Sequence, residues 1–395
     1  MMNANTDEQY LEKLKTYRQN LHKIPELGRH LPKTKQYLIS VLEQLNCRMT
    51  FLCDSGICAF FDKGRTETIA FRGDMDALPI EEATQCTYAS THEGNMHACG
   101  HDGHMAMVLT LGEYVNTQDE LPYNILLIFQ PAEETLGGAE EICKSGILEQ
   151  YNVKQLFGIH LWPFLEAGKI SSRPGAMMPK SSEINIHIHG KAAHGTSPYE
   201  GCDALYIGTH LVRNIYIRHA AMAGAIPHFS AGTGDLPHAA KSSPERRTLI
   251  HFGKLDSGYA RNVVSDYTHI LGTIRAFSEE DFKQLLTLIK NNIRESEQSY
   301  GCRMEFTSSE GYPPVVNDPT LYKEILPTLN TLDYEELKTP LMISEDFSFY
   351  GHYAPAVFFL LGTGTNIPLH SNNFDFDESI LMGGFYLYRT LLKQV

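Results

Sequence analysis

The sequence predicts an α/β fold built on a mainly parallel sheet, with a smaller α+β domain inserted into it. At 395 residues the chain is long for one hydrophobic core, so we expect two domains. In its first and last parts, short continuous apolar runs alternate with helical patterns, which is typical of parallel strands buried on both faces. Between these parts, apolar and polar residues alternate, which indicates a sheet with one wet face.

The outer parts of the chain supply the elements of the parallel-sheet domain. Apolar residues at helical spacing over 10–24 predict an amphipathic helix that Pro25 ends, and a second helical pattern covers 104–115. Short apolar runs bounded by turn residues predict five buried strands, at Ile57–Phe61, Thr68–Phe71, Ile125–Phe129, Phe157–Ile159 and Val357–Leu361.

The middle of the chain predicts the inserted domain. Ile184, Ile186 and Ile188 alternate with polar residues and indicate a half-buried strand. The elements that follow are a helix, two strands and another helix, at 205–215, 248–252, 267–274 and 279–293. We expect residues 304–306 and the late strand to return to the first domain. The predicted domains are therefore 1–181 together with 295–395, and 182–294.

The composition describes an acidic globular protein and excludes two classes of partner. Acidic residues outnumber basic ones by 47 to 33, which argues against nucleic acid because phosphate binding needs clustered Lys and Arg. No stretch approaches the roughly 18 apolar residues of a membrane span. The N-terminus has no basic start followed by an apolar core, and the eight cysteines form no CxxC pair. We therefore expect a cytoplasmic protein with reduced thiols.

A dense cluster of metal-ligating residue types lies at 96–104. These nine residues hold three histidines, one cysteine and one aspartate. Imidazole, thiolate and carboxylate are the groups that hold transition metals in proteins. Because the chain has 18 histidines, their density alone does not decide for a metal site.

The ends of the predicted strands add further polar residues of the same kinds. Open α/β sheets place their sites at the carboxyl ends of strands. A metal cluster beside two adjacent carboxylates predicts a hydrolase that activates water. The residues that follow predicted strands are Asp74 and Asp76, Glu133 and Glu134, His160, and, after a Gly/Thr-rich loop, His370.

These motifs resemble those of the M20 metallopeptidases, in particular their amidohydrolase branch, which includes hippurate hydrolases, N-acetyldiaminopimelate deacetylases and auxin-conjugate hydrolases. The resemblance runs nearly end to end. It implies a metallo-hydrolase catalytic domain and an inserted lid and dimerisation domain. The matching stretches are His22–Gly28, Arg72–Pro79, Met96–His104, Gln130–Glu134, Gly158–His160, Gly190–His194, Asn262–Val264, Gly272–Phe277 and Ser344–Phe347.

The resemblance implies two divalent metal ions per chain. Zn, Mn, Co and Ni are all compatible with a mixed set of Cys, His and Glu ligands. Cys99 would bridge the two ions, in a position where the wider family uses aspartate. The implied metal ligands are Cys99, His101, Glu134, His160 and His370.

The resemblance also implies catalytic and substrate-binding residues. Glu133 would be the general base and Asp76 would support the site. His194 would reach the active site of the partner subunit and stabilise the oxyanion there, so a homodimer formed through the inserted domain is expected. Asn262 and Arg275 would receive the substrate carboxylate, although Arg275 could instead form a structural ion pair.

The activity that the resemblance implies is hydrolysis of the amide bond in small N-acyl-amino acids, with an N-acetyl or an aromatic acyl group. One alternative is a dipeptidase-like peptidase of the same family. Another is a catalytically inactive metal-binding or interaction protein on the same fold. A thiol enzyme centred on Cys99 is disfavoured, because four other candidate ligands surround that residue in the resemblance.

Other residues keep more than one interpretation. His97 and His104 flank the metal cluster and are expected to orient ligands rather than to bind metal. Asp102 is expected to orient a ligand or to begin a helix, and Trp162 could line a substrate pocket or pack in the core. Residues 226–247 depart from the family's pattern, and this departure bears on the substrate rather than on the reaction.

Overall fold

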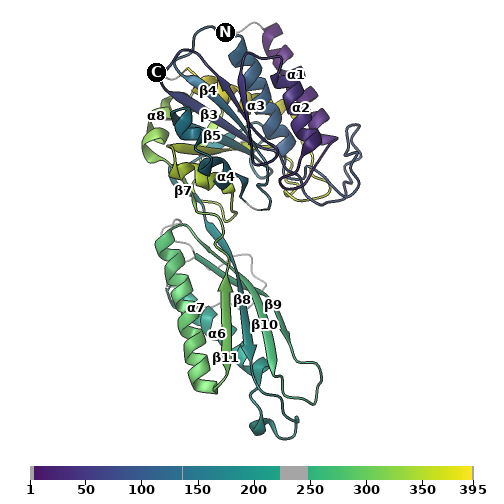
Figure 1. Cartoon of the computed structure of the whole chain (residues 1–395), viewed down its shortest axis with the longest axis vertical. Helices are drawn as coiled ribbons and strands as arrows, with labels where there is room; N and C mark the ends of the chain where they lie inside the picture. The colour runs from purple at the N-terminus through teal and green to yellow at the C-terminus, as the bar shows by residue number, and fades with distance from the viewer. Residues whose placement is uncertain (1–3, 136, 223–247, 394–395) are drawn as a thin grey trace. The chain divides into compact units, whose positions relative to one another are not determined.

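Two large sheets organise the chain in the computed structural model (Figure 1). The structure describes residues 4–135, 137–222 and 248–393, so the region 226–247 lies outside the described residues. One unit comprises Met1–Gly175, Val316–Lys338 and Glu345–Val395, and the second comprises Ala176–Val315 and Thr339–Ser344.

An eight-stranded sheet forms the centre of the first unit. Its strands are β1 (Arg48–Leu52), β2 (Gly56–Phe61), β3 (Thr68–Asp74), β4 (Asn124–Gln130), β5 (Val153–Trp162), β6 (Ile170–Ser172), β13 (Tyr334–Glu336) and β14 (Ala356–Gly362). They lie in the order β1-β2-β4-β3-β5-β14-β6-β13. The four central strands β4, β3, β5 and β14 run parallel, which confirms the predicted mainly parallel sheet.

One predicted strand has a direction that its composition does not reveal. The apolar run at 57–61 forms β2, which runs antiparallel to β4 with Ile57 opposite Phe129. All six residues of β2 are buried, as are all seven residues of β3. A continuous apolar run therefore reports burial on both faces, and the direction of the strand depends on its connections.

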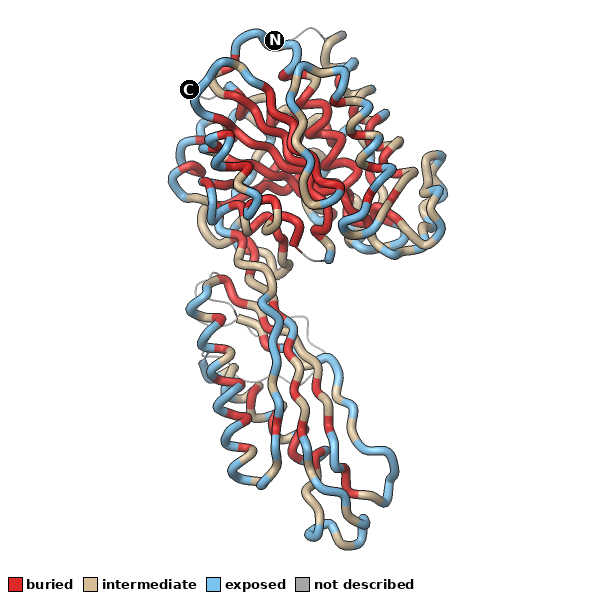
Figure 2. Tube along the Cα trace, in the orientation of Figure 1, coloured by how far each residue is buried: buried red, intermediate tan, exposed pale blue. Residues whose placement is uncertain are grey.

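Helices surround this sheet and bury it along most of its length (Figure 2). They are α1 (Ala4–His22), α2 (Pro32–Leu42), α3 (His101–Asn116), α4 (Gly138–Lys144), α5 (Ile147–Gln150), α8 (Pro319–Leu329) and α9 (Leu381–Leu391), with 3-10 turns η3 (Asp346–His352) and η4 (Glu378–Ile380). Helix α3 packs against β3 on one side and against α1 and α9 on others, so it is buried almost throughout. The polar residues at its start are therefore carried into the interior.

The second unit is a four-stranded antiparallel sheet with two helices. Its elements are β8 (Lys180–His189), η1 (Pro198–Glu200), α6 (Ala204–Met222), β9 (Thr248–Ser257), β10 (Tyr267–Ala276), α7 (Glu279–Tyr300) and β11 (Arg303–Ser308), and β7 (Gly175–Met178) pairs separately with β12 (Val315–Asn317). Ile184, Ile186 and Ile188 are buried in one core with residues of α6 and α7, while their neighbours in β8 are exposed or half-buried. The alternation thus marks a sheet with one wet face. No helix in the described ranges is both long and apolar enough to span a membrane.

The expectation that residues 304–306 return to the first domain is wrong. They belong to β11, which pairs antiparallel with β8 and places Phe306 opposite Ile186. The second unit accordingly extends past residue 294, to Val315. A short strand at the edge of a sheet can pair with a strand far away in sequence, and the local pattern of its residues does not predict which strand that is.

Candidate metal centre

The metal-ligating residues gather at one edge of the parallel sheet. Asp74 ends β3, His160 lies near the end of β5, and Glu134 and His370 follow β4 and β14. Because these four strands run in the same direction, their carboxyl ends meet at the same edge. The start of α3 brings Cys99 and His101 to the same place.

The structure brings together all five of the ligands that the resemblance implied. Cys99 Sγ lies 3.4 Å from His160 Nε2, and Glu134 Oε1 lies 3.3 Å from His370 Nε2 and 3.9 Å from His101 Nε2. Potential ligand atoms within 4.8 Å of one another occur in the set of Cys99, His101 and His160 and in the set of Cys99, Glu134 and His370. Cys99 belongs to both sets, as a bridging ligand must.

Backbone carbonyl groups orient two of the imidazole rings. His101 Nδ1 donates to the Asp76 carbonyl oxygen at 2.7 Å, and His160 Nδ1 donates to the Leu161 carbonyl oxygen at 2.7 Å. A carbonyl oxygen only accepts, so each ring carries its proton on Nδ1 and turns the Nε2 lone pair inward. This fixed tautomer is the one that a metal ligand needs.

Buried polar atoms without partners support a cation at this place. Within the described part of the chain, His101 Nε2 is buried and accepts no hydrogen bond, and the buried Glu134 Oε1 has an ion-pair contact with His370 but no well-formed hydrogen bond. Burial and the nearby Glu134 carboxylate raise the pKa of the Cys99 thiol well above its usual value, so the thiol stays protonated unless a cation compensates. The donor set of thiol, imidazoles and carboxylate therefore suits a divalent transition metal.

Asp76 holds the two adjacent glutamates by their backbone. Its Oδ1 accepts from the Glu133 N–H at 2.9 Å, and its Oδ2 accepts from the Glu134 N–H at 3.0 Å. The preceding residue, Ala132, has a φ of 61° in the left-handed region, which turns the chain sharply after β4. The Asp76 carboxylate thus fixes the backbone position of both glutamates.

The two glutamates have opposite electrostatic surroundings. Burial and the nearby carboxylates of Glu345 and Glu134 raise the pKa of Glu133 well above its usual range. Burial also disfavours the charged form of Glu134, but the hydrogen bond from His370 and the proximity of His101 outweigh it and lower the pKa of Glu134. A carboxyl with high proton affinity next to one held as a carboxylate is an acid–base arrangement.

His104 uses both ring nitrogens in hydrogen bonds within the protein. The pairing of β3 with β5 ends at Arg72 and Gly158, so the N–H of Leu161 finds no partner on β3. That N–H donates to His104 Nε2 at 2.9 Å, and His104 Nδ1 donates to Asp74 Oδ1 at 2.6 Å. Both ring nitrogens are used, which leaves none for a metal.

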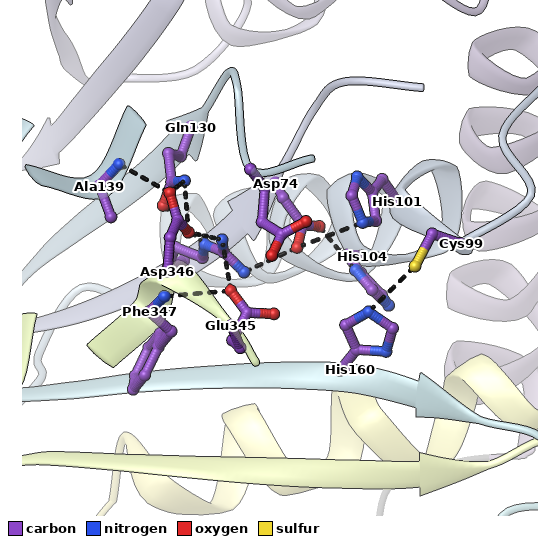
Figure 3. A network of polar contacts seen from close by, with 12 residues as sticks. Asp74, Cys99, His101, His104, Gln130, Ala139, His160, Glu345, Asp346 and Phe347 are labelled. Atoms are coloured by element: carbon purple, nitrogen blue, oxygen red, sulfur yellow. Dashed lines mark hydrogen bonds and ion pairs between the residues drawn. The ribbon is translucent and has the colours of Figure 1, made fainter. Parts of the chain in front are cut away.

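A buried guanidinium group, that of Arg72, connects the ends of β3 and β4 to η3. Figure 3 shows several of its partners, among them Asp74, Gln130 and Asp346. Arg72 donates to Asp74 Oδ2 at 2.7 Å, to Glu345 Oε1 at 3.0 Å and to Asp346 Oδ1 at 2.8 Å. It also donates to Gln130 Oε1 at 2.9 Å, and Gln130 in turn donates to Asp346. We assigned no role to Arg72, Gln130, Glu345 or Asp346 from the sequence. The available signal was an arginine directly after the apolar run Thr68–Phe71.

A second buried ion pair lies behind the start of α3. His22 Nδ1 contacts Asp102 Oδ2 at 2.8 Å, and His22 Nε2 contacts Glu82 Oε1 at 3.2 Å. Asp102 therefore orients no metal-ligating histidine directly. His97, which is also buried, has its pKa lowered to about 3 by burial, so its ring is neutral. Trp162 makes an edge-to-face contact with Phe164, with ring centroids 5.8 Å apart.

The residues implied in the second unit fall into two places. His194 is exposed and forms a bridge with Val263, and the Gly195 N–H donates to the Asn262 carbonyl oxygen at 2.8 Å. Arg275 lies near the other end of β10 and donates to the Met342 carbonyl oxygen at 2.6 Å. The eight residue steps from Tyr267 to Arg275 span about 26 Å. Within one protomer, Asn262 therefore lies beside His194, beyond the end of β10 that is far from Arg275.

The comparison with known families agrees with this centre. The chain matches the peptidase family M20/M25/M40 over residues 70–394. It belongs to this family. An uncharacterized hydrolase of Staphylococcus saprophyticus is 33% identical to this M20 protein over 396 residues, which cover 97% of each chain. One from Staphylococcus epidermidis is 32% identical over 398 residues.

Solved structures of M20-like proteins have the same fold along the whole chain. A proposed aminohydrolase from methicillin-resistant Staphylococcus aureus superposes with a TM-score of 0.87 at 27% identity, over 98% of both chains. A dinuclear metal binding peptidase of the M20 family from Bacillus subtilis superposes with a TM-score of 0.81 at 25% identity, over 98% of this chain and 100% of the other. This M20 protein is thus a hydrolase of the family, with side chains suited to hold metal.

Replacing Arg72 by methionine should destabilise the first unit strongly. The substitution leaves Asp74, Glu345 and Asp346 buried without their countercharge, and breaking a buried ion pair on one side costs about 3–5 kcal/mol. Denaturant unfolding can be followed by the fluorescence of Trp162, the single tryptophan, which lies in β5. Lys144→Met, which removes an exposed ion pair with Glu140, should have a much smaller effect. Equal effects of the two substitutions would contradict this interpretation.

The stabilisation that His22 provides should disappear as the pH rises. Burial lowers the pKa of His22, but the carboxylates of Asp102 and Glu82 outweigh it and raise the pKa to about 9. Since this lies above the ordinary value of about 6.5, the stabilisation is complete below pH 6.5 and is lost as the pH rises through 9. With a chelator present, the advantage of wild type over His22→Gln in unfolding free energy should fall by about 3 kcal/mol between pH 6 and 10. A difference independent of pH would refute this.

Proposed function

We propose that this protein is a metal-dependent amidohydrolase that cleaves the amide bond of small N-acyl-amino acids. One observation carries the proposal: Asp76 anchors two adjacent glutamates, of which Glu134 lies among the metal-ligating atoms and Glu133 is buried beside them. A carboxylate that ligates metal next to one that transfers protons is the minimum that water activation requires. The family and the peptidase of known structure that binds two metal ions support the same reaction class.

Two divalent ions, drawn from Zn, Mn, Co or Ni, would be held by five side chains. Cys99 would bridge them, and the remaining ligands would be His101, Glu134, His160 and His370. Metal ions bound there would lower the pKa of water and polarise the scissile carbonyl group.

The protein's own groups then carry the proton transfer. Glu133, as a carboxylate, would take a proton from the attacking water and pass it to the nitrogen of the leaving amine. Asp76 keeps the Glu133 backbone in place during both transfers. Glu133 and Asp76 are buried, and a buried environment strengthens the electrostatic interactions of such groups with the reacting atoms.

The substrate carboxylate and the oxyanion would be bound by residues of the second unit. Asn262 precedes the Tyr267 end of β10, and Arg275 lies about 26 Å from Tyr267 near the other end of the strand. The two side chains are therefore not expected to reach one small substrate from the same protomer. We therefore propose a homodimer formed through the second unit. In it, His194 and Asn262 of one protomer and Arg275 of the other would serve the same substrate.

A peptidase activity is the competing function, because structural relatives include peptidases. Both reactions use the same centre and differ in what lies on the acyl side of the amide. A panel of N-acetyl-amino acids, benzoyl-glycine and dipeptides, assayed with each of the four metals, separates the two. Turnover of dipeptides alone would replace our proposal by the peptidase, and metal binding without turnover of any substrate would indicate the inactive protein.

Two substitutions at neighbouring positions should separate catalysis from metal binding. Glu133→Gln removes proton transfer only, so turnover should fall by about 10²- to 10⁴-fold while metal content is unchanged. Glu134→Gln removes a ligand, so metal content should fall and added metal should restore part of the activity. Metal content can be measured by elemental analysis of the dialysed protein. Near wild-type turnover in Glu133→Gln would show that another group is the base.

Mixing two inactive variants should restore activity if sites are shared between protomers. In a mixed dimer of His194→Ala and Glu133→Ala, one site carries both defects and the other carries neither. After chain exchange, which differently tagged chains can verify, turnover should rise well above that of either variant alone. Verified exchange without recovered activity, or a fully active monomer, would refute the shared site.

A further inference from the structure

A buried arginine outside the metal centre contacts segments that carry its ligands. Arg18, near the end of α1, is 1% exposed. Its Nε donates to Asp102 Oδ2 at 3.1 Å, and one terminal nitrogen donates to Asp375 Oδ1 at 2.6 Å. The other terminal nitrogen donates to the Phe376 carbonyl oxygen at 3.3 Å and to the Tyr88 hydroxyl at 3.1 Å.

These contacts join two segments that are far apart in sequence. Asp102 is the second residue of α3 and directly follows His101. Asp375 and Phe376 lie in the loop between β14 and η4, five and six residues after His370. One rigid side chain therefore connects the helix that carries one metal-ligating histidine with the loop that carries another.

The loop that holds His370 is also held by the buried rings of Phe374 and Phe376, but His370 itself lies at its exposed part. His370 has a φ of 64°, and its side chain is 52% exposed, unlike the buried His101 and His160. Its N–H donates to the Ala98 carbonyl oxygen at 2.9 Å, and the Asn372 carbonyl oxygen accepts from the Ala83 N–H at 2.8 Å. The left-handed conformation is costly for a histidine, so neighbouring contacts must maintain it.

Charge makes the contacts of Arg18 hard to replace. Asp102 is completely buried, and Glu378 Oε1 lies 3.5 Å from the guanidinium group in addition to the contact with Asp375. The Phe376 ring packs against the guanidinium plane at 3.9 Å. Without the arginine, Asp102 would keep its contact with His22, but Asp375 and Glu378 would lose the cation that they share with Asp102. The attraction of the loop and η4 to the start of α3 would then be lost.

We propose that Arg18 is a positioning residue of the metal centre, which holds His370 in register with His101 by tying their segments to one guanidinium group. The proposal rests on the proposed function, because it requires that His370 ligates metal. Arg18 itself touches neither metal nor substrate. Groups that orient metal ligands typically change metal affinity by 10- to 100-fold when they are lost.

The test is metal binding by the full-length protein, titrated with Zn²⁺ or Mn²⁺ after removal of bound metal. In Arg18→Gln, one of the two ions should bind at least 10-fold more weakly. Asp375→Asn, which disturbs only the contact between Arg18 and the loop, should weaken binding of the same ion by a smaller factor. The control is Asn317→Ala, a buried polar residue of the first unit whose amide donates to the Arg173 carbonyl oxygen at 2.7 Å and whose oxygen accepts from the Phe358 N–H. It should lower the melting temperature and leave both affinities unchanged.

A double-mutant cycle shows whether Arg18 acts through His370. If it does, Arg18→Gln should weaken metal binding much less in a His370→Ala background than in wild type. Additive effects, or unchanged affinity in both Arg18→Gln and Asp375→Asn, would overturn the proposal. If Arg18→Gln does not fold, Asp375→Asn carries the same cycle. A wild-type protein that binds no metal would refute the proposed function itself, which distinguishes the two failures.

Discussion

The buried guanidinium group of Arg72 is the interaction on which the centre depends. It stands at the end of β3 and is surrounded by carboxylates from β3 and from the segment that begins η3. Burying one cation with three carboxylates is tolerable only when each oxygen has a hydrogen-bond donor, and Gln130, His104 and the Ala139 N–H supply them. This requirement fixes the ends of β3, β4 and η3 relative to one another, and the metal-ligating residues follow from those ends.

Around this anchor, the chain departs from regular structure where chemistry is needed. Ala132 and His370 adopt left-handed backbone conformations, and Gly100 does the same at the start of α3. A side chain at Gly100 would lie 2.8 Å from Leu161 Cδ1, so the close approach of α3 to β5 requires glycine there. Such conformations persist because the surrounding contacts, which include buried central strands, maintain them. Two buried arginines contribute to these contacts: Arg72 binds the ends of β3 and β4 and the start of η3, and Arg18 binds Asp102 of α3 and the loop before η4.

The two units carry different kinds of candidate site residue. The parallel sheet supplies a fixed edge for groups whose positions must be exact to within fractions of an ångström, such as metal ligands and a proton carrier. In the antiparallel unit, Asn262 precedes β10 and Arg275 lies near the far end of that strand, so the strand keeps the two side chains apart.

The sequence by itself determined the fold class and most of the elements, and its resemblance to the M20 family pointed to five candidate metal ligands together with Glu133 and Asp76. Continuous apolar runs, alternating isoleucines and clustered ligand types are local signals, because burial and ligand chemistry depend on residue type. Tertiary structure decided the direction of β2, the place of β11 and the hydrogen-bond partners of His104, which are distant in sequence. It also decided the roles of Arg72 and Arg18. The carboxylates that surround each buried guanidinium group come from distant parts of the sequence, and no local pattern predicts them.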